Sequence, residues 1–293
     1  MNPAAAGRLS EAQVENFWRD GYVVAEGAVT ATQLEKMRAG LERWIDESRG
    51  HDKAYGETID ARPRFDLAHT HRTDAPALRR VDNPPEIDSV YAQVAFDGGL
   101  VDMIADLIGP DLKFHHAKIN LKQPGSETRV DWHQDFSYTP HTNDHVVTAL
   151  LMLDDMTEEN GCLMGVPGSH REGQMSLWRG EVFAGKVDED TARSAKIRAR
   201  PVTGRAGSVC LMHTMLLHGS EPNQSASARA LYICVYSASD AMPLTRSPLP
   251  NRFEGRIVRG KASRFARIDP GTVELPPGYR AVSFFEVQEK GVA

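Results

Sequence analysis

Two histidines and one aspartate have the spacing of a metal site. His133 and Asp135 flank a single residue in the stretch Trp132-His133-Gln134-Asp135. Along an extended strand, residues i and i+2 point to the same side, so this imidazole and this carboxylate could bind one metal ion together. His218 ends an apolar run further along the chain and can supply a third ligand. Two histidines and one carboxylate on one face of a metal leave positions open for other ligands, which is typical of non-haem Fe(II) oxygenases.

Other histidines could compete for the third position, because the chain has 11 of them. His170 follows Pro167 and Gly168, two residues that favour a turn. His213 lies five residues before His218, and at that odd offset it would face the other side of a regular strand. We therefore expect neither His170 nor His213 to bind the metal.

A carboxylate clamp is indicated next to the metal motif. Arg229 follows His218 by eleven residues and begins the apolar stretch 229–237. A guanidinium at the start of a buried strand needs an anionic partner, and its two parallel N–H donors match a carboxylate. We expect Arg229 to hold an acidic ligand close to the metal.

The elements that must position these residues change character along the chain. The first third predicts helices that start with capping boxes at Ser10 and Thr30, together with two more helices over 86–96 and 100–108. Residues 51–85 are expected to be irregular. A short strand is predicted at 21–24, between the first two helices. Beyond residue 85, short β-branched or alternating runs predict strands at 114–123, 146–153, 162–167, 197–202, 207–213, 230–237 and 281–287. The pattern indicates a mainly β protein with helices on its N-terminal side.

The composition sets limits on the class of protein. The chain has 293 residues, 25% of them charged, with a net charge of −6. It contains no apolar run long enough for a transmembrane helix and no recognisable secretion signal, so we expect a cytoplasmic protein without membrane contact. The acidic balance disfavours nucleic-acid binding. Three widely spaced cysteines predict buried free thiols.

The chain resembles the phytanoyl-CoA dioxygenase family of Fe(II)/2-oxoglutarate-dependent oxygenases, which includes the ectoine hydroxylases. The resemblance rests on WHQD (132–135), NGCLMGVPGSH (160–170) and LHGSEPNQSASAR (217–229), and it runs from about residue 10 to 240. It implies a double-stranded β-helix, a jelly roll of the cupin kind, with flanking N-terminal helices. We expect one domain over 1–293, with a helical cap mostly in 1–110 and the β-helix core mostly in 111–293.

The resemblance also implies the main site residues. Fe(II) would be bound by His133, Asp135 and His218. Arg229 would pair with the distal carboxylate of 2-oxoglutarate, and Ser220 would add a hydroxyl near the same end. O₂ would be the second co-substrate.

Further residues are assigned by their place near the metal motif. Asn120 lies thirteen residues before His133, as in the ectoine hydroxylase-like members, and His116 falls where those members have a glutamine. Both are expected to face the co-substrate, whereas His115 should point the other way. Substrate contacts are predicted for Phe136, Tyr138 and Lys118.

The implied activity is oxidation of a substrate coupled to conversion of 2-oxoglutarate into succinate and CO₂. Asp135 favours hydroxylation over halogenation, because related halogenases have Gly or Ala at that position. We expect a small, anionic or polar metabolite to be hydroxylated at an unactivated C–H bond by a monomer or homodimer. Arginines in two segments favour an anion: five in 51–85, and several among the seven basic residues of 245–268. Both segments are candidate lids.

Two other functions fit the same ligand set. A redox-inert cupin-type metalloenzyme, acting as a lyase, isomerase or hydrolase, could use two histidines and one carboxylate. Such an enzyme has no use for a carboxylate clamp at Arg229. A metal-binding sensor without catalysis is the third possibility, and the long segment 51–85 argues against it.

Overall fold

A computed structural model describes residues 8–125, 128–278 and 283–292, and its centre consists of two antiparallel β-sheets. The larger sheet has the order β1-β11-β6-β13-β4-β3-β2, with β14 paired to β4, and the smaller has the order β10-β7-β12-β5. The strands of the larger sheet are β1 (Tyr22–Ala25), β2 (Phe65–Leu67), β3 (Leu78–Asp82), β4 (Leu112–Lys122), β6 (Val146–Met152), β11 (Val209–His213), β13 (Arg229–Ala238) and β14 (Ile257–Arg259). Those of the smaller sheet are β5 (Val130–His133), β7 (Leu163–Gly165), β10 (Arg200–Val202) and β12 (His218–Ser220).

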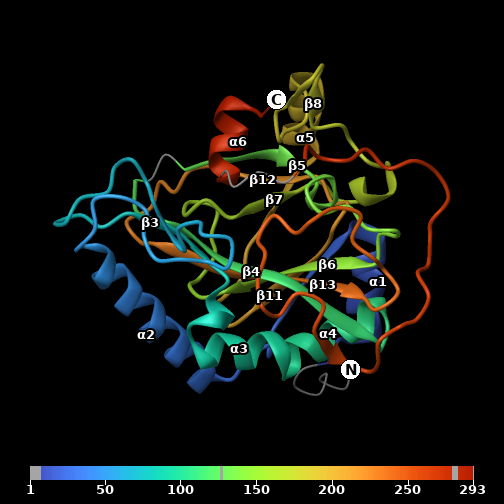
Figure 1. Ribbon diagram of the computed structural model, residues 1–293, viewed down its shortest axis with the longest axis horizontal. Coiled ribbons are helices and arrows are strands. Elements are labelled where there is room, and N and C mark those ends of the chain that lie inside the picture. Colours follow the sequence, from blue (N-terminus) through green and yellow to red (C-terminus); the bar gives the residue numbers. More distant parts are fainter. Residues whose placement is uncertain (1–7, 126–127, 279–282, 293) are drawn as a thin grey trace.

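The helices lie mainly outside the two sheets. Figure 1 shows α2, α3 and α4 along one side of the larger sheet and strands β5, β7 and β12 on its other side. A short hairpin, β8 (Trp178–Arg179) with β9 (Val182–Phe183), lies beyond the smaller sheet. The helices are α1 (Glu11–Asp20), α2 (Ala31–Ser48), α3 (Ser89–Phe96), α4 (Gly99–Ile108), α5 (Glu189–Arg198) and α6 (Phe284–Lys290), with 3-10 turns η1 (Pro84–Glu86), η2 (Asp135–Ser137) and η3 (Ser169–Arg171). The mainly β architecture with N-terminal helices is confirmed.

Both faces of the larger sheet are covered, and this separates its residues into two sets. On β4, Ala117, Ile119 and Leu121 are buried in the apolar core that includes the helices. The alternate residues face the space between the sheets and are polar: His116, Lys118, Asn120 and Lys122. The period of two along a strand therefore places a row of polar groups inside the molecule.

Helix α3 is held against the larger sheet by two tyrosines of β13. The hydroxyl of Tyr232 donates to the carbonyl of Tyr91 at 3.0 Å, and that of Tyr236 donates to the carbonyl of Ala95 at 2.9 Å. Tyr91 in turn donates to the carbonyl of Met37 on α2 at 2.8 Å. Each buried phenol thus has an acceptor, and these hydrogen bonds fix the positions of α2 and α3 relative to the larger sheet.

The predicted helix starts are confirmed. Ser10 and Gln13 form a capping box before α1, and Thr30 and Gln33 form another before α2. Gly21 ends α1 with a positive φ of 84°, a conformation in which glycine has no steric penalty. The three cysteines are buried and free, as expected.

Two expectations about the fold are wrong. The segment 51–85 is not irregular throughout, because it contains β2 and β3, which extend the larger sheet. The strand expected at 21–24 is confirmed as β1, which forms the opposite edge of this sheet. Residues 284–290 of the predicted strand 281–287 form helix α6, whereas 281–282 lie outside the described residues. A short apolar run such as this one does not distinguish a strand from a helix.

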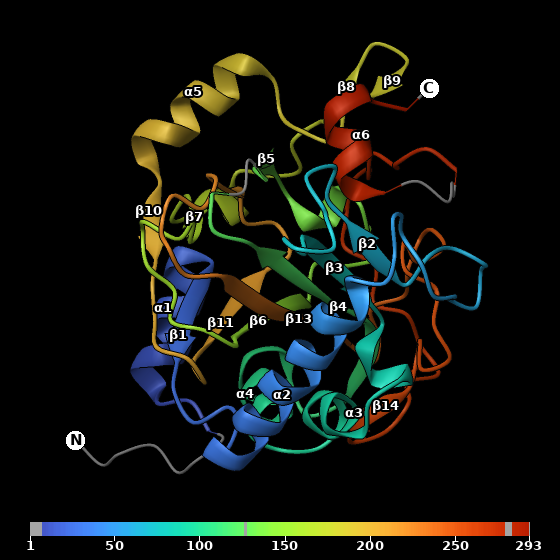
Figure 2. The ribbon, with the colours of Figure 1, turned by 90° about the vertical axis from the view of Figure 1, so that its left-hand side faces the viewer.

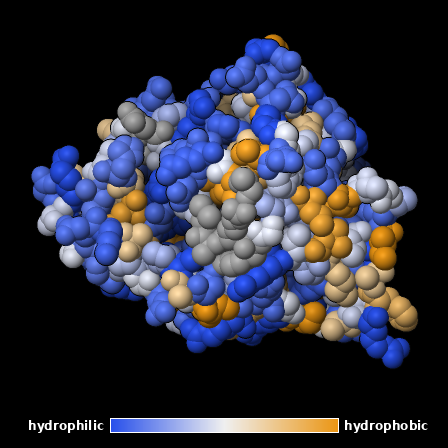
Figure 3. Space-filling model, turned by 45° about the horizontal axis from the view of Figure 1, so that its top comes forward, coloured by the Kyte–Doolittle hydropathy of each residue, from blue (hydrophilic) through white to orange (hydrophobic). Residues whose placement is uncertain are grey.

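The surface is mostly polar. Figure 3 shows hydrophilic residues over most of one face, with apolar residues in separate patches. Several arginines of 245–268 are paired on this surface; Arg259 contacts Asp102 at 2.7 Å and Arg267 contacts Asp240 at 3.3 Å. Among the described residues, no helix is both long enough and apolar enough to cross a membrane.

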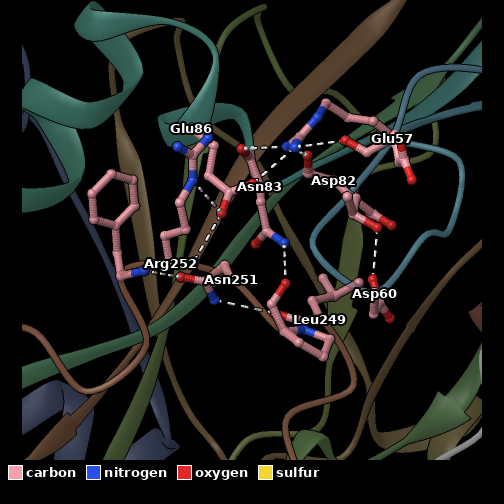
Figure 4. Close-up of polar contacts among 12 residues, drawn as sticks. Glu57, Asp60, Asp82, Asn83, Glu86, Leu249, Asn251 and Arg252 are labelled. Atoms are coloured by element: carbon pink, nitrogen blue, oxygen red, sulfur yellow. Dashed lines mark hydrogen bonds and ion pairs between the residues drawn. The ribbon is translucent and has the colours of Figure 1, made fainter.

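The two candidate lid segments are joined through the buried carboxylate of Glu86. Arg64 donates to the carboxylate of Glu86 at 2.8 Å and to the carbonyls of Asp82 and Asn83. Glu86 also accepts from the backbone N–H of Arg252 at 2.8 Å. Figure 4 shows this network, in which a loop of the first segment and a loop of the second converge on Glu86. These parts of the two segments are therefore fixed to each other.

We predict that Arg64→Met destabilises the protein by about 3–5 kcal/mol, because it leaves the carboxylate of Glu86 buried without its main partner. The side chains of Arg64 and Glu86 are only 6% and 1% exposed. Arg72→Met is the matched control, since Arg72 and Asp74 are 69% and 82% exposed and such pairs contribute about 0–1 kcal/mol. Urea unfolding of both variants measures the difference, and equal free energies of unfolding would contradict the role of the network.

Candidate active site

The structure brings the three predicted metal ligands together. His133 ends β5 and is paired directly opposite His218, which begins β12. Asp135 follows in η2, with one oxygen 3.5 Å from Nε2 of His133 and 3.8 Å from Nε2 of His218. The three ligand atoms lie within 4.8 Å of one another, and no other group of this kind is found among the described residues.

The histidines are oriented for a metal by their second ring nitrogens. Nδ1 of His133 lies 2.8 Å from the carbonyl of Asp131, and Nδ1 of His218 lies 2.9 Å from that of Leu216. Each Nδ1 therefore carries the proton, which leaves the Nε2 lone pair toward Asp135. Burial, with the neighbouring His133, lowers the pKa of His218 to about 4, so its imidazole is neutral and able to bind a cation.

The aspartate is held by its own partners. Its second oxygen accepts a hydrogen bond from the hydroxyl of Thr148 on β6 at 2.6 Å. Burial would raise the pKa of Asp135, but the adjacent His218 and His133 keep it well below its ordinary value. Gln134 points away and is fully buried, with its side chain bonded to the backbone of Met215 at 2.7 Å. This anchor fixes the backbone between the two ligands.

A small cavity connects the metal ligands with Arg229. It has a volume of about 70 Å³, and its lining includes His133, Asp135, His218 and Arg229. Arg229 is 3% exposed, and its Nη2 donates to the carbonyl of Gly161. Its Nε is buried and has no hydrogen-bond partner within the part of the chain that the structure describes. A buried unpaired donor is costly, so this atom indicates a missing acidic ligand.

Lys122 is a second basic side chain in this cavity, and it was not among the predicted site residues. Its ammonium lies 2.8 Å from the hydroxyl of Ser220 and also contacts the carbonyl of Glu221. Burial, together with the charge of Arg229, lowers the pKa of Lys122 to about 6. The alternation that carries Lys118 and Asn120 to this face continues to position 122 and could have identified it.

A larger cavity of about 640 Å³ opens on the other side of the metal ligands. Asp135 and Tyr138 belong to its wall, which also includes Arg62 and Arg246 from the two candidate lid segments. Helix α6 closes part of it, and Figure 2 shows this helix over β5 and close to β2. The ring of Phe284 lies 5.3 Å from that of His133 and lines both cavities. This contact was not predicted, because the segment was expected to be a strand.

The other predicted site residues are distributed between the two cavities. Asn120 and Ser220 line the small one, and Lys118 lines both. His116 lines only the larger cavity, on the opposite side from the position expected for a co-substrate ligand. Phe136 is buried and lines neither cavity.

The histidines that were set aside lie elsewhere, with one correction. His213 and His170 are buried side by side, with ring centroids 5.1 Å apart, away from the metal ligands. His115 does not point away from His116; their Nδ1 atoms are 2.6 Å apart. The pairing of β4 with β13 skips His115, which forms a β-bulge, and a bulge breaks the alternation of side chains.

Comparison with known proteins identifies the family. Residues 17–231 match the model of the phytanoyl-CoA dioxygenase family, so the chain belongs to this family. A probable alpha-ketoglutarate-dependent hypophosphite dioxygenase of Stutzerimonas stutzeri is 35% identical over 68% of this chain and 69% of its own length. The L-proline trans-4-hydroxylase of Streptomyces griseoviridis is 26% identical over 78% of this chain and 86% of its own length. Iron-bound EctD from S. alaskensis has the same fold, with a TM-score of 0.67 at 23% identity over 90% of both chains.

The resemblance seen in the sequence is thereby confirmed. The chain is a 2-oxoglutarate-dependent dioxygenase, and the expected Fe(II), 2-oxoglutarate and O₂ are the cofactors of its class. The donor set fits Fe(II): two imidazoles and one carboxylate converge, and Arg229, whose Nε has no partner among the described residues, lines the adjoining cavity.

We predict that Arg229→Met weakens 2-oxoglutarate binding by roughly two to three and a half orders of magnitude. Removing one partner of a buried charge pair costs about 3–5 kcal/mol, and 1.4 kcal/mol corresponds to a factor of ten. Arg229→Lys should recover only part, because one ammonium cannot make a two-pronged contact. Anaerobic calorimetry with Fe(II)-loaded protein measures the affinity. Unchanged affinity with normal iron content would show that Arg229 does not hold the co-substrate.

We also predict that 2-oxoglutarate binding takes up a proton at Lys122. Above pH 6 this amine is neutral before binding, and a nearby carboxylate raises its pKa again. Affinity should therefore fall as the pH rises from about 7 to 9, by up to tenfold per pH unit. Lys122→Met should remove this pH dependence while iron content stays normal. Calorimetry in two buffers of different ionisation enthalpy counts the protons, and equal uptake by both proteins would refute the assignment.

Proposed function

We propose that this protein hydroxylates an unactivated C–H bond, or makes an equivalent oxidation, in a small anionic or polar metabolite. One molecule each of O₂ and 2-oxoglutarate would be consumed, with one oxygen atom entering the product and the other entering succinate as CO₂ leaves. The observation that carries the proposal is the continuous path from the metal ligands to the unpaired Nε of Arg229, with a separate larger cavity for a substrate. We also infer that the two facing sheets correspond to the double-stranded β-helix of this family.

The residues would act mainly by binding and orientation. His133, Asp135 and His218 would hold the iron, which supplies the oxygen chemistry when bound. Arg229, with Lys122 beside it, would hold the distal carboxylate of 2-oxoglutarate and so fix which end faces the metal. Phe284 would separate the two cavities and exclude water from the reacting atoms.

The lining of the larger cavity supports a polar substrate. Arg62, Arg80, Lys118 and Arg246 border it, together with aromatic and aliphatic side chains. Hypophosphite, L-proline and ectoine appear in the names of the relatives, and all three are small polar or charged molecules. We propose a substrate of that size and polarity. The expectations of a cytoplasmic location and of a monomer or homodimer stay predictions.

Succinate formation tests the proposal. Fe(II)-loaded protein should convert 2-oxoglutarate into succinate in step with the oxidation of one member of a panel of small acids and amino acids. His218→Ala should lose this activity, whereas His213→Ala, a buried histidine outside the site, should keep it. A wild type that retains iron but binds no 2-oxoglutarate would favour the redox-inert metalloenzyme instead.

A further inference from the structure

Two cations lie side by side where the two cavities meet. Arg80 projects from β3 and Lys118 from β4, and both line the small and the large cavity. Strand β3 pairs with β4, with Arg80 opposite Asn120 and Asp82 opposite Lys118. These two cations therefore share one face of the sheet, and that face is turned toward the metal ligands.

Among the described residues, Arg80 has no acidic partner at ion-pair distance, because Asp66, its cross-strand neighbour on β2, is paired with Arg79. It is 5% exposed, and its Nε donates to the side-chain oxygen of Asn120 at 3.0 Å. Its Nη2 is buried and has no hydrogen-bond partner in the described residues. The aromatic rings of Phe284 and Phe285 lie 5.4 and 4.8 Å from the guanidinium carbon. They cover the cation but cannot neutralise its charge.

Lys118 also lacks an acidic partner at contact distance. Asp82 is its direct cross-strand neighbour, yet the two form no ion pair within 4.0 Å. No hydrogen bond of the Lys118 ammonium is found in the ranges that the structure describes, and the ring of Phe284 lies 5.8 Å from it. One oxygen of Asp82 is buried without a partner as well. The lysine therefore extends past Asp82 toward the cavities.

The charge around this junction is not balanced by the metal and the co-substrate. With 2-oxoglutarate bound, the cations that line the small cavity are Arg80, Lys118, Arg229 and Lys122, which takes up its proton on binding, and the metal would add two more positive charges. The opposing carboxylates are Asp135, which lines it, and Asp82, beside Lys118. A third carboxylate, Asp66, lies opposite Arg80, but its charge is offset by the ion pair with Arg79. 2-Oxoglutarate brings two negative charges, one end for the metal and the other for Arg229. An excess of positive charge is left at Arg80 and Lys118.

We propose that Arg80 and Lys118 form a binding subsite for an oxyanion group of the substrate, placed directly beside the metal. The inference rests on the proposed function and adds to it the chemical class of the substrate. Because both cations border the cavity of the metal ligands, the oxidised atom should be bonded to the oxyanion group or lie close to it. A phosphinate, a phosphonate or a carboxylate has the required charge, and the rest of the larger cavity accommodates the organic part.

Four variants test the subsite. Arg80→Met and Lys118→Met remove one cation each while keeping most of the volume. Arg72→Met is the control for Arg80, because Arg72 belongs to the same segment, is 69% exposed and lines neither cavity. Lys113→Met is the control for Lys118, because it lies on the same strand and donates to the carbonyl of Ser239.

The probes are chosen to separate charge from shape. Hypophosphite and ethylphosphonate represent phosphorus oxyanions, propionate represents carboxylates, and propionamide is the neutral analogue of propionate. Binding is measured anaerobically by calorimetry on protein loaded with Fe(II) and 2-oxoglutarate. Iron content and 2-oxoglutarate affinity are measured on the same samples, so that a failure of the proposed function is recognised separately.

We expect the wild type to bind at least one oxyanion and to bind propionamide at least tenfold more weakly. Each subsite variant should weaken oxyanion binding by about 10- to 100-fold, the usual effect of losing a charged hydrogen bond, while the controls change it less than about threefold. If the phosphorus oxyanions bind more tightly than propionate, the substrate carries a phosphorus oxyanion; the reverse order indicates a carboxylate.

The proposal is overturned if no oxyanion binds at millimolar concentration to a wild type that binds iron and 2-oxoglutarate. It is also overturned if Arg80→Met and Lys118→Met lose 2-oxoglutarate instead, since the two cations would then serve the co-substrate.

Discussion

The pairing of β5 with β12 sets the geometry of the whole site, because it puts His133 directly opposite His218. Both rings are oriented by carbonyls of the backbone two residues earlier, so the strands themselves determine where the metal would lie. A slip of one residue in this register would turn one of the two rings to the other face of the sheet. Gln134 and Thr148 then fix Asp135 in the remaining position, from two different directions.

The second constraint is the burial of positive charge between the sheets. Strand β4 exposes only apolar residues to the helices, and it collects its polar residues on the side where the ligands bind. Cations in such a place cost stability, because they are removed from water without full compensation. The protein keeps them at the positions where anionic ligands would restore the balance, so part of its stability would come from the molecules that it binds.

Much of this could be predicted from the sequence, because the decisive residues lie in short local patterns. The H-x-D triplet, the distal histidine and Arg229 needed only their spacing and the resemblance to a family. Helix starts were equally local, since capping boxes involve residues three positions apart. The residues that were not predicted contact partners that are distant from them in the sequence. Thr148 reaches Asp135 from a strand that carries no polar pattern, and Arg64 meets Glu86 only because two loops converge.

Local irregularities explain the remaining differences. The β-bulge at His115 could not be read from alternation, since a bulge is an exception to it. Helix α6 was mistaken for a strand because its apolar residues are too few to show a helical period. The consequence matters for function, because α6 brings Phe284 over His133 and closes the site from the end of the chain.

The central claim is that one metal ion and one 2-oxoglutarate molecule share the path from the His133, Asp135 and His218 triad to Arg229. A crystal structure of the protein loaded anaerobically with Fe(II) and 2-oxoglutarate, with anomalous data at the iron edge, tests this claim directly. We predict a single iron peak between the three ligand atoms and a carboxylate of 2-oxoglutarate within hydrogen-bond distance of Nε of Arg229. Iron at any other histidine, or a co-substrate whose free carboxylate lies away from Arg229, would contradict the account.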